Sequence, residues 1–494
     1  THVICLGSKS PTIERHPRPA DYRWAVLLNE AFTASSQNLN MMVTLMNLLT
    51  NPRSILCAFM VFTGAIVSSS WAMADEVETE NVSARYQITY NTQSHPAFRS
   101  PYAAVNSLTA AADRMFTFSA TAHWGARVWE GGELYINPEF AAGVPFAGNL
   151  VGLGGFTNGE ITRAAGSQPK PYLQRLFLRQ TWNQGGEREA VEADFNQMAG
   201  QVDQNRFVLT AGNFSTLDVF DDNAYAKDPR TQFMNWGNWT YAAYDYAADA
   251  RGFGVGVAAE WYRKDWVYRL ARMSGPREPN GLQMDFALAQ HYGDQFEVEH
   301  AHTLGDQPGK LRVLAWRNRA VLANFNDATA YLKANPGTNP QSFFNVRKGE
   351  QIKYGLGVNL EQALSPMVGF FLRAMKADGR SETYAFTEVD DSISTGVRLD
   401  GKLWSRADDV VGLAWLRNGL SKDRRSFLEA GGISYFIGDG QIRYQPEQIV
   451  EAFYSWQLIK GTWLTADVQH IQNPAYNASR GPLTVYALRA HVEF

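Results

Sequence analysis

The chain has 494 residues, a formal net charge of −4 and a mean hydropathy of −0.30. This hydropathy excludes a polytopic helical membrane protein, and the lack of a basic block argues against a nucleic-acid partner. Charged residues make up only 19% of the chain and aromatic residues 13%, and 41 residues are glycine. This composition is typical of many strands joined by glycine turns.

The first recognisable segment lies at residues 41–74. Arg53 precedes an apolar run at 55–62, and small residues occupy the positions before Asp75. This pattern predicts a secretory signal peptide, because the run is too short for a membrane anchor and small residues follow it. Residues 1–40 lack an initiating methionine and a periodic pattern, so we expect an upstream or disordered extension.

We therefore expect residues 75–494 to form the mature protein. Both cysteines, Cys5 and Cys57, precede this part of the chain. An exported protein without disulfides or cysteine metal sites fits an outer-membrane barrel, because hydrogen bonding around a closed sheet supplies its rigidity.

The clearest hairpin is predicted between residues 116 and 140. Apolar and polar side chains alternate on both sides of a turn at Gly131-Gly132. Successive side chains of a strand point to opposite faces, and glycine supplies the positive φ that a tight turn needs. The polar face carries His123, Arg127 and two glutamates, which suits a water-filled interior better than a soluble core.

The same alternation recurs at residues 175–182, 352–361, 450–458, 464–469 and 486–494. An apolar-outward, polar-inward strand of about nine residues can cross a bilayer when it is tilted. At roughly 25 residues for a strand and its connection, the mature chain would hold about 16 strands. We predict an all-β fold, a transmembrane antiparallel β-barrel with inward-folded loops.

One long polar connection, residues 326–340, is expected to contain a short helix. Asn326-Asp327 would cap this helix, which would run through Leu332 before Pro336-Gly337 ends it.

The last strand, residues 486–494, alternates strictly and ends on an aromatic residue, Phe494. This ending resembles the closing-strand signal of bacterial outer-membrane barrels. We predict that the strand pairs with one that begins near Tyr86 and closes the barrel, and that Phe494 acts as an assembly signal.

Several motifs occur in order along residues 85–494. They are HPAFRSPY at 95–102, NSL at 106–108, ELYINPE at 133–139, RLFLRQ at 175–180, AKDPR at 226–230, FMNW at 233–236, GDG at 438–440, NPAYN at 473–477 and RGP at 480–482. Together they resemble the bacterial carbohydrate-selective porins of the outer membrane. The resemblance implies a 16-stranded barrel that passes sugars by diffusion.

A porin needs a narrow polar eyelet with weak, multiple hydrogen-bonding sites. Arg175 and Arg179 lie four residues apart on one strand face, so both should point into the lumen. There they would either line the constriction or pair with lumen acids such as Glu192 and stiffen the wall.

The segment 218–239 is the best candidate for an inward-folded loop, because mixed charges alternate with aromatic residues. Such a mixture suits a sugar-selective constriction; the alternative is an extracellular loop with a solvated charged face. The candidate contacts are Asp218, Asp221, Asp222, Lys227, Arg230 and Trp236. The segment 95–99 is expected to be a turn or plug contact.

The sequence offers no enzymatic constellation. It has no Gly-x-Ser-x-Gly elbow, His-Glu-x-x-His motif, Cys-x-x-Cys pair or Walker loop. Adjacent acids such as Asp221-Asp222 and Asp390-Asp391 would face opposite ways on a strand, and His123 and His470 fit lumen or girdle positions. We expect no catalysis, cofactor or metal.

The expected partners are carbohydrate solutes, outer-membrane lipid and the barrel assembly machinery, with the porin present as a monomer or trimer. Two alternatives stay open. One is a porin for other small solutes such as organic acids, and the other is a secreted all-β protein that binds or cleaves sugars.

Overall fold

The computed structural model describes residues 79–337, 343–440 and 442–494. Sixteen of its strands form one closed antiparallel barrel, and β5 (Arg188–Val191) and β6 (Gly200–Asp203) form a separate two-stranded sheet. The prediction of a 16-stranded β-barrel is confirmed. The predicted extension and signal peptide, residues 1–74, lie outside the described residues.

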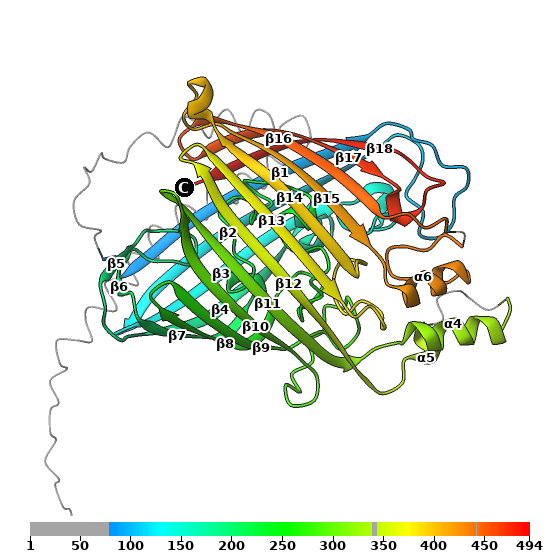
Figure 1. The fold of residues 1–494 in the computed structure, drawn as a ribbon, viewed down its shortest axis with the longest axis horizontal. Helices are drawn as coiled ribbons and strands as arrows, with labels where there is room; N and C mark the ends of the chain where they lie inside the picture. Colours follow the sequence, from blue (N-terminus) through cyan, green and yellow to red (C-terminus); the bar gives the residue numbers. More distant parts are fainter. Residues whose placement is uncertain (1–78, 338–342, 441) are drawn as a thin grey trace, which may run out of the picture. The chain divides into compact units, whose positions relative to one another are not determined.

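The barrel strands follow one another in chain order around the wall (Figure 1). Their bounds are β1 (Val82–His95), β2 (Asp113–Trp129), β3 (Gly132–Val144), β4 (Gly166–Asn183), β7 (Arg206–Phe214), β8 (Gly254–Arg263), β9 (Trp266–Met273), β10 (Tyr292–Leu304), β11 (Gln307–Val321), β12 (Glu350–Ser365), β13 (Val368–Ala377), β14 (Asp391–Asp400), β15 (Val410–Gly419), β16 (Glu447–Ile459), β17 (Thr462–Gln472) and β18 (Leu483–Glu493).

The barrel closes between β1 and β18, as predicted. The Tyr86 and Phe494 main chains exchange two hydrogen bonds of 2.8 and 3.0 Å, and their rings stack with centroids 5.4 Å apart. The register continues from Gln87 opposite Glu493 to Ser94 opposite Tyr486. No sheet edge is left unpaired at this seam.

The strand periodicity places apolar residues outside and polar residues inside. In β9 exposed and buried residues alternate, with Leu270 57% exposed and Arg269 only 7% exposed. The guanidinium of Arg269 lies 3.0 Å from Glu297 and 2.9 Å from Glu299. The inner wall is therefore polar and paired in charge, as the alternation predicted.

The two ends of the barrel differ in the length of their connections. Several connections at the end where β1 begins and β18 ends are tight turns, such as 130–131, 264–265 and 460–461. We call this the short-turn end and the opposite one the long-loop end. The helices α4 (Phe325–Ala334), α5 (Phe343–Val346) and α6 (Lys422–Glu429) lie at the long-loop end (Figure 1).

The predicted helix near Asn326 is present as α4 but begins and ends outside the predicted bounds. The side chain of Asn324, not Asn326, caps it by accepting a hydrogen bond from the Asn326 amide. The helix then continues to Ala334, close to Pro336-Gly337. Within the described residues no helix is both long and apolar enough to cross a membrane.

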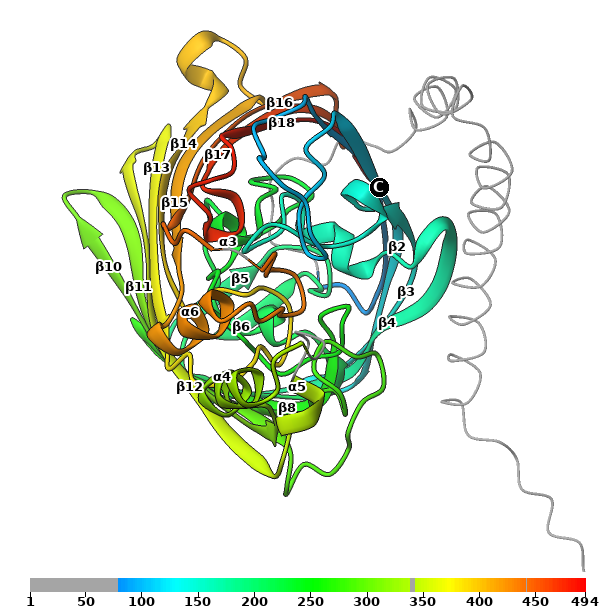
Figure 2. The same ribbon diagram turned by 90° about the vertical axis from the view of Figure 1, so that its right-hand side faces the viewer.

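The connection between β7 and β8, residues 215–253, lies inside the barrel and fills much of it. It contains two short helices, η3 (Thr216–Asp218) and α3 (Trp236–Trp239). Figure 2, seen from the long-loop end, shows α3 within the ring of strands. The prediction that the segment 218–239 folds inward is confirmed.

Candidate functional site

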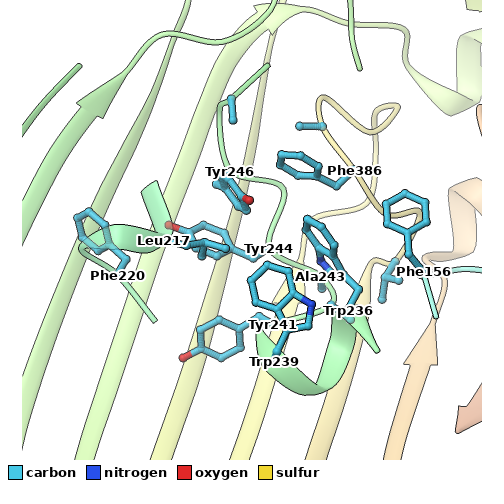
Figure 3. Close-up of a cluster of buried hydrophobic side chains, with 14 of the residues drawn as sticks. Phe156, Leu217, Phe220, Trp236, Trp239, Tyr241, Ala243, Tyr244, Tyr246 and Phe386 are labelled. Atoms are coloured by element: carbon cyan, nitrogen blue, oxygen red, sulfur yellow. The ribbon is translucent and has the colours of Figure 1, made fainter. Parts of the chain in front are cut away.

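We call the connection between β7 and β8, residues 215–253, the inward loop. Aromatic packing gives this loop its shape. Figure 3 shows Trp236 and Trp239 of α3 beside Phe156 and Phe386, which come from two other connections. The Trp236 ring stacks on Phe386 at 4.9 Å and meets Phe156 edge-on at 5.6 Å. Trp236 is only 2% exposed, so its ring mainly supports the loop, and its contact with solute stays a prediction.

Asp221 anchors the loop to the barrel wall. Its carboxylate accepts hydrogen bonds from Arg373 Nε at 2.8 Å, Asn359 Nδ2 at 2.6 Å and Thr240 Oγ1 at 2.8 Å. Asp221 is fully buried and has a φ of 55°, a conformation that aspartate tolerates better than most residues. It was predicted to line the eyelet, but these contacts direct its side chain to the barrel wall.

Glu451 of β16 holds the start of α3. One carboxylate oxygen accepts the Met234 and Asn235 amides at 2.6 and 3.1 Å, and the other accepts Asn238 Nδ2 at 2.6 Å. The sequence shows only that Glu451 lies on a polar strand face. Which backbone amides it binds depends on the path of a loop more than 200 residues away in the chain.

Arg230 ties the middle of the loop to the opposite wall. Its guanidinium lies 2.7 Å from both Glu139 of β3 and Glu160 of the β3–β4 connection. Burial alone would lower the pKa of Arg230, but Glu160 and Glu139 outweigh it and raise the pKa. The residue is permanently charged and fixed in place.

These anchors leave a cavity of about 500 Å³ between the loop and the wall. Of the predicted residues, Arg175, Asp218, Asp222, Lys227, Arg230 and Trp236 border it. Its other titratable lining residues include His123, Arg163, Asp194, Asp228, Arg251 and Glu493. The cavity therefore offers hydrogen-bond donors and acceptors of both charges.

Arg175 and Asp218 form the clearest pair in the cavity. Two parallel hydrogen bonds of 2.7 and 2.6 Å join the guanidinium to the carboxylate. Burial would raise the pKa of Asp218, but Arg175 outweighs this effect and lowers it. The Arg175 guanidinium also lies 5.1 Å above the Phe253 ring.

Asp222 and Lys227 form a looser pair, with 3.9 Å between the closest atoms. The Asp222 side chain is 56% exposed. Partial desolvation of the carboxylate favours its neutral form, but Lys227 and then Arg312 outweigh this effect and lower the pKa of Asp222 to about 2. Lys227 Nζ also donates to two loop carbonyls, Phe220 and Asp221, at 3.1 and 3.2 Å.

Arg179 points inward as predicted but binds the backbone of the β4–β7 connection. Its Nη1 donates to the Asn196 carbonyl at 2.9 Å, and its guanidinium lies 5.3 Å from the Tyr135 ring centre. The prediction that Glu192 pairs with a lumen arginine is wrong. Glu192 is exposed, because residues 184–205 form a hairpin that brings Asn196, rather than Glu192, to the wall.

Two histidines, His123 and His95, lie in different surroundings. His123 lies in the lumen as predicted and contacts Gln87 Nε2 at 2.9 Å. His95 ends β1, and its ring contacts Phe98 and Phe146. The segment 95–99 leads into the β1–β2 connection and does not line the cavity. Arg251, 4.4 Å above the Tyr172 ring, was missed because its spacing in the sequence carries no strand or motif signal.

Comparison with known proteins agrees with this architecture. The model of the OprB family, described as carbohydrate-selective porins, matches residues 106–494. No curated protein sequence matches the chain. The high-pH structure of Pseudomonas putida OprB is similar with a TM-score of 0.60 and 13% identity, over 84% of this chain and 94% of that chain.

Other similar solved structures include the low-pH structure of Pseudomonas putida OprB, with a TM-score of 0.46, 9% identity and coverage of 84% of this chain and 93% of that one. The outer membrane channel DcaP of Acinetobacter baumannii has a TM-score of 0.46 and 9% identity, over 84% of this chain and 97% of that chain. The family match spans most of the chain, and the first structure supports the same barrel fold. The chain belongs to the OprB family of carbohydrate-selective porins and is a carbohydrate porin of the bacterial outer membrane.

Proposed function

We propose that mono- or oligosaccharides diffuse passively through the cavity between the inward loop and the wall. The observation that carries this proposal is the Arg175–Asp218 pair at the edge of that cavity. A sugar hydroxyl both donates and accepts hydrogen bonds, so an ion pair presents a partner for each role. Passage of this kind needs no bond chemistry and no cofactor.

The pairing of charges favours neutral solutes. Arg175 and Arg230 already bind carboxylates within 2.7 Å, so an organic acid must compete with a protein carboxylate for either guanidinium. A sugar can add weak hydrogen bonds without breaking the ion pair. Weak, multiple contacts let a solute enter and also leave.

We also infer how the chain is exported and inserted into the outer membrane. Residues 41–74 direct export and are removed, and the barrel assembly machinery recognises the closing strand that ends at Phe494. Lipid then covers the outer face, where Leu270, Phe296 and Leu356 border an apolar hollow of about 830 Å³. The mature porin is either a monomer or a trimer, which native mass measurement in detergent distinguishes.

The test is conductance of the purified porin in planar bilayers, titrated with neutral sugars and with organic acids. We expect neutral sugars to reduce the single-channel current in a saturable way. Liposome swelling with the same solutes should be faster for the neutral sugars. Faster uptake of the acids, or no sugar block at all, would contradict the proposal.

A further inference from the structure

The connection between β4 and β7, residues 184–205, is unusual for the short-turn end. Tight turns such as 264–265 and 460–461 join other strands there. This connection instead contains the hairpin β5 (Arg188–Val191) and β6 (Gly200–Asp203). Figure 1 places the hairpin at the end opposite α4 and α6, and Figure 2 shows it within the ring of strands.

The stem of this hairpin is largely exposed, but its tip turns into the barrel. β5 is exposed over most of its length, whereas Met198 and Ala199 are 2% and 8% exposed. We call residues 192–199 the tip segment. At the turn of this segment Asp194 is exposed, and Phe195 and Asn196 are partly buried.

Three barrel strands hold the tip segment through side chains. Asn137 of β3 donates to Asn196 Oδ1 at 2.8 Å, and Arg179 of β4 donates to the Asn196 carbonyl at 2.9 Å. The ring of Phe195 lies 4.4 Å from that of His123 on β2. These contacts fix the two residues at the turn of the tip.

A second set of contacts fixes the base of the tip segment. The Ala199 amide donates to Glu80 Oε2 at 2.9 Å, and the Glu80 amide donates to the Ala199 carbonyl at 3.0 Å. Arg127 Nη2 donates to the same carbonyl at 3.1 Å. The tip is therefore tied to the wall and to the residues that precede β1.

The turn itself presents its side chains to the cavity. The backbones of Asp194 and Gln197 exchange hydrogen bonds of 3.0 and 3.2 Å, and Asn196 between them has a φ of 56°. Asparagine adopts this left-handed conformation at low cost. Asp194, Phe195 and Asn196 all border the same 500 Å³ cavity as Arg175 and Asp218.

The charges differ between the two sides of this cavity. The connections at the long-loop end bring both signs, with Arg163 and Arg251 as well as Asp218, Asp222 and Asp228. At the short-turn end the lining charges are acidic, because Glu493 ends β18 there and the tip segment brings Asp194. Partial desolvation of its carboxylate, and then the charges of Glu493 and Asp228, raise the pKa of Asp194, while the Phe195 amide and Arg85 oppose this. Asp194 and Glu493 are therefore two acids that line this side of the cavity, with Arg85 as a nearby basic group.

We propose that Asp194, Phe195 and Asn196 form a second selectivity element, which narrows the channel on its periplasmic side and disfavours anionic sugars. The side is assigned because outer-membrane barrels have short periplasmic turns and longer extracellular loops. The hydroxyls of a neutral sugar can donate hydrogen bonds to Asp194 and Asn196, whereas the carboxylate of an anionic sugar is repelled by the carboxylate of Asp194. This inference rests on the proposed function, because it requires that solute pass through this cavity.

The test compares Asp194→Asn with Glu187→Gln in planar bilayers. Glu187 is an exposed acid on the stem of the same hairpin, so its variant removes the same charge away from the cavity. The probes are glucose and its anionic relative glucuronate. For Asp194→Asn we expect the entry rate of glucuronate from the periplasmic side to rise about fivefold at low salt, the factor that one like charge at about 4 Å in water produces.

Phe195→Ala provides a second, steric measurement. We expect a larger single-channel conductance and a weaker dependence on solute size, because the ring leaves the passage. Heat-modifiable gel migration identifies variants that fold, and only folded channels enter the bilayer. The Glu187→Gln channel should match the parent in both measurements.

The outcomes separate this inference from the proposed function. If glucose does not block the parent channel, the proposed function fails. If glucose blocks the parent channel and Arg175→Ala weakens the block, yet Asp194→Asn and Phe195→Ala both match Glu187→Gln, the second selectivity element does not exist.

Discussion

At the scale of single residues, charge pairing decides which side chains meet solute. Arg175 and Asp218 border the cavity and bind each other through two hydrogen bonds. Asp221 has the same carboxylate but is fully buried against Arg373. Residue type alone did not distinguish these roles, since both aspartates occur in one acidic, aromatic-rich segment.

Replacing Arg175 with alanine should weaken sugar binding. The change removes the donor and leaves Asp218 unpaired, so we expect the apparent dissociation constant for a blocking sugar to rise about tenfold, the worth of one charge-assisted hydrogen bond. Current block in planar bilayers measures it. Arg188→Gln, which removes a charge from a side chain that is 68% exposed, is the control, and an equal effect in both variants would argue against Arg175 as a binding residue.

The neighbouring aspartates Asp221 and Asp222 give a matched stability test. Asp221→Asn leaves the guanidinium of Arg373 buried without its charge partner, and we expect the free energy of unfolding to fall by about 3–5 kcal/mol. Asp222→Asn should change it by less than about 1 kcal/mol, since that side chain is 56% exposed. Urea unfolding in detergent micelles measures both, and equal losses would contradict the anchor role.

At the scale of elements, the sequence predicted strands well and connections poorly. Strand alternation is local, so β2, β12 and β16 could be recognised from their own residues. The inward loop was recognisable as a candidate, because its mixed charges alternate with aromatic rings, but an extracellular loop with a solvated charged face remained the alternative. The tip segment was missed because its position depends on Asn137, Arg179 and Glu80, which lie far from it in sequence.

The loop anchor on Glu451 predicts a change in conductance without loss of the barrel. In Glu451→Gln a neutral amide presents one oxygen and one NH₂ group to three donors, those of Met234, Asn235 and Asn238. We expect α3 to loosen and current fluctuations to increase, because at least one of the donors loses its acceptor. Single-channel recordings show this as added noise, and a quiet channel of parental conductance would contradict it.

At the scale of the whole molecule, closure of the sheet sets the position of every lumen residue. Tyr86 and Phe494 meet at the seam through two main-chain bonds and a ring contact. The prediction of this pairing from the last strand was correct, since a barrel of consecutive antiparallel strands must close between its first and last strands. The lumen contacts could not be predicted, because they depend on register between distant strands.

Deletion of Phe494 should reduce the yield of folded barrel more than it alters sugar block. The change removes the ring contact and both bonds to the Tyr86 main chain. We expect less heat-modifiable protein in the outer membrane, while channels that do assemble bind sugar as before. Phe494→Leu keeps the main-chain bonds, so its yield of folded barrel should lie between those of the parent and the deletion. A normal yield from the deletion would contradict a role of Phe494 in closure.

The inward loop and the tip segment enter the barrel from opposite ends, so the fixed charge differs between the two ends of the passage. Asp194 and Glu493 border it at the short-turn end, whereas the connections of the long-loop end bring charges of both signs, such as Arg251 and Asp228. A pore whose fixed charge is distributed unevenly along its length behaves as a weak diode for salt ions. Such a pore carries unequal currents when the voltage is reversed, so the orientation of a single inserted channel can be read from its current–voltage curve.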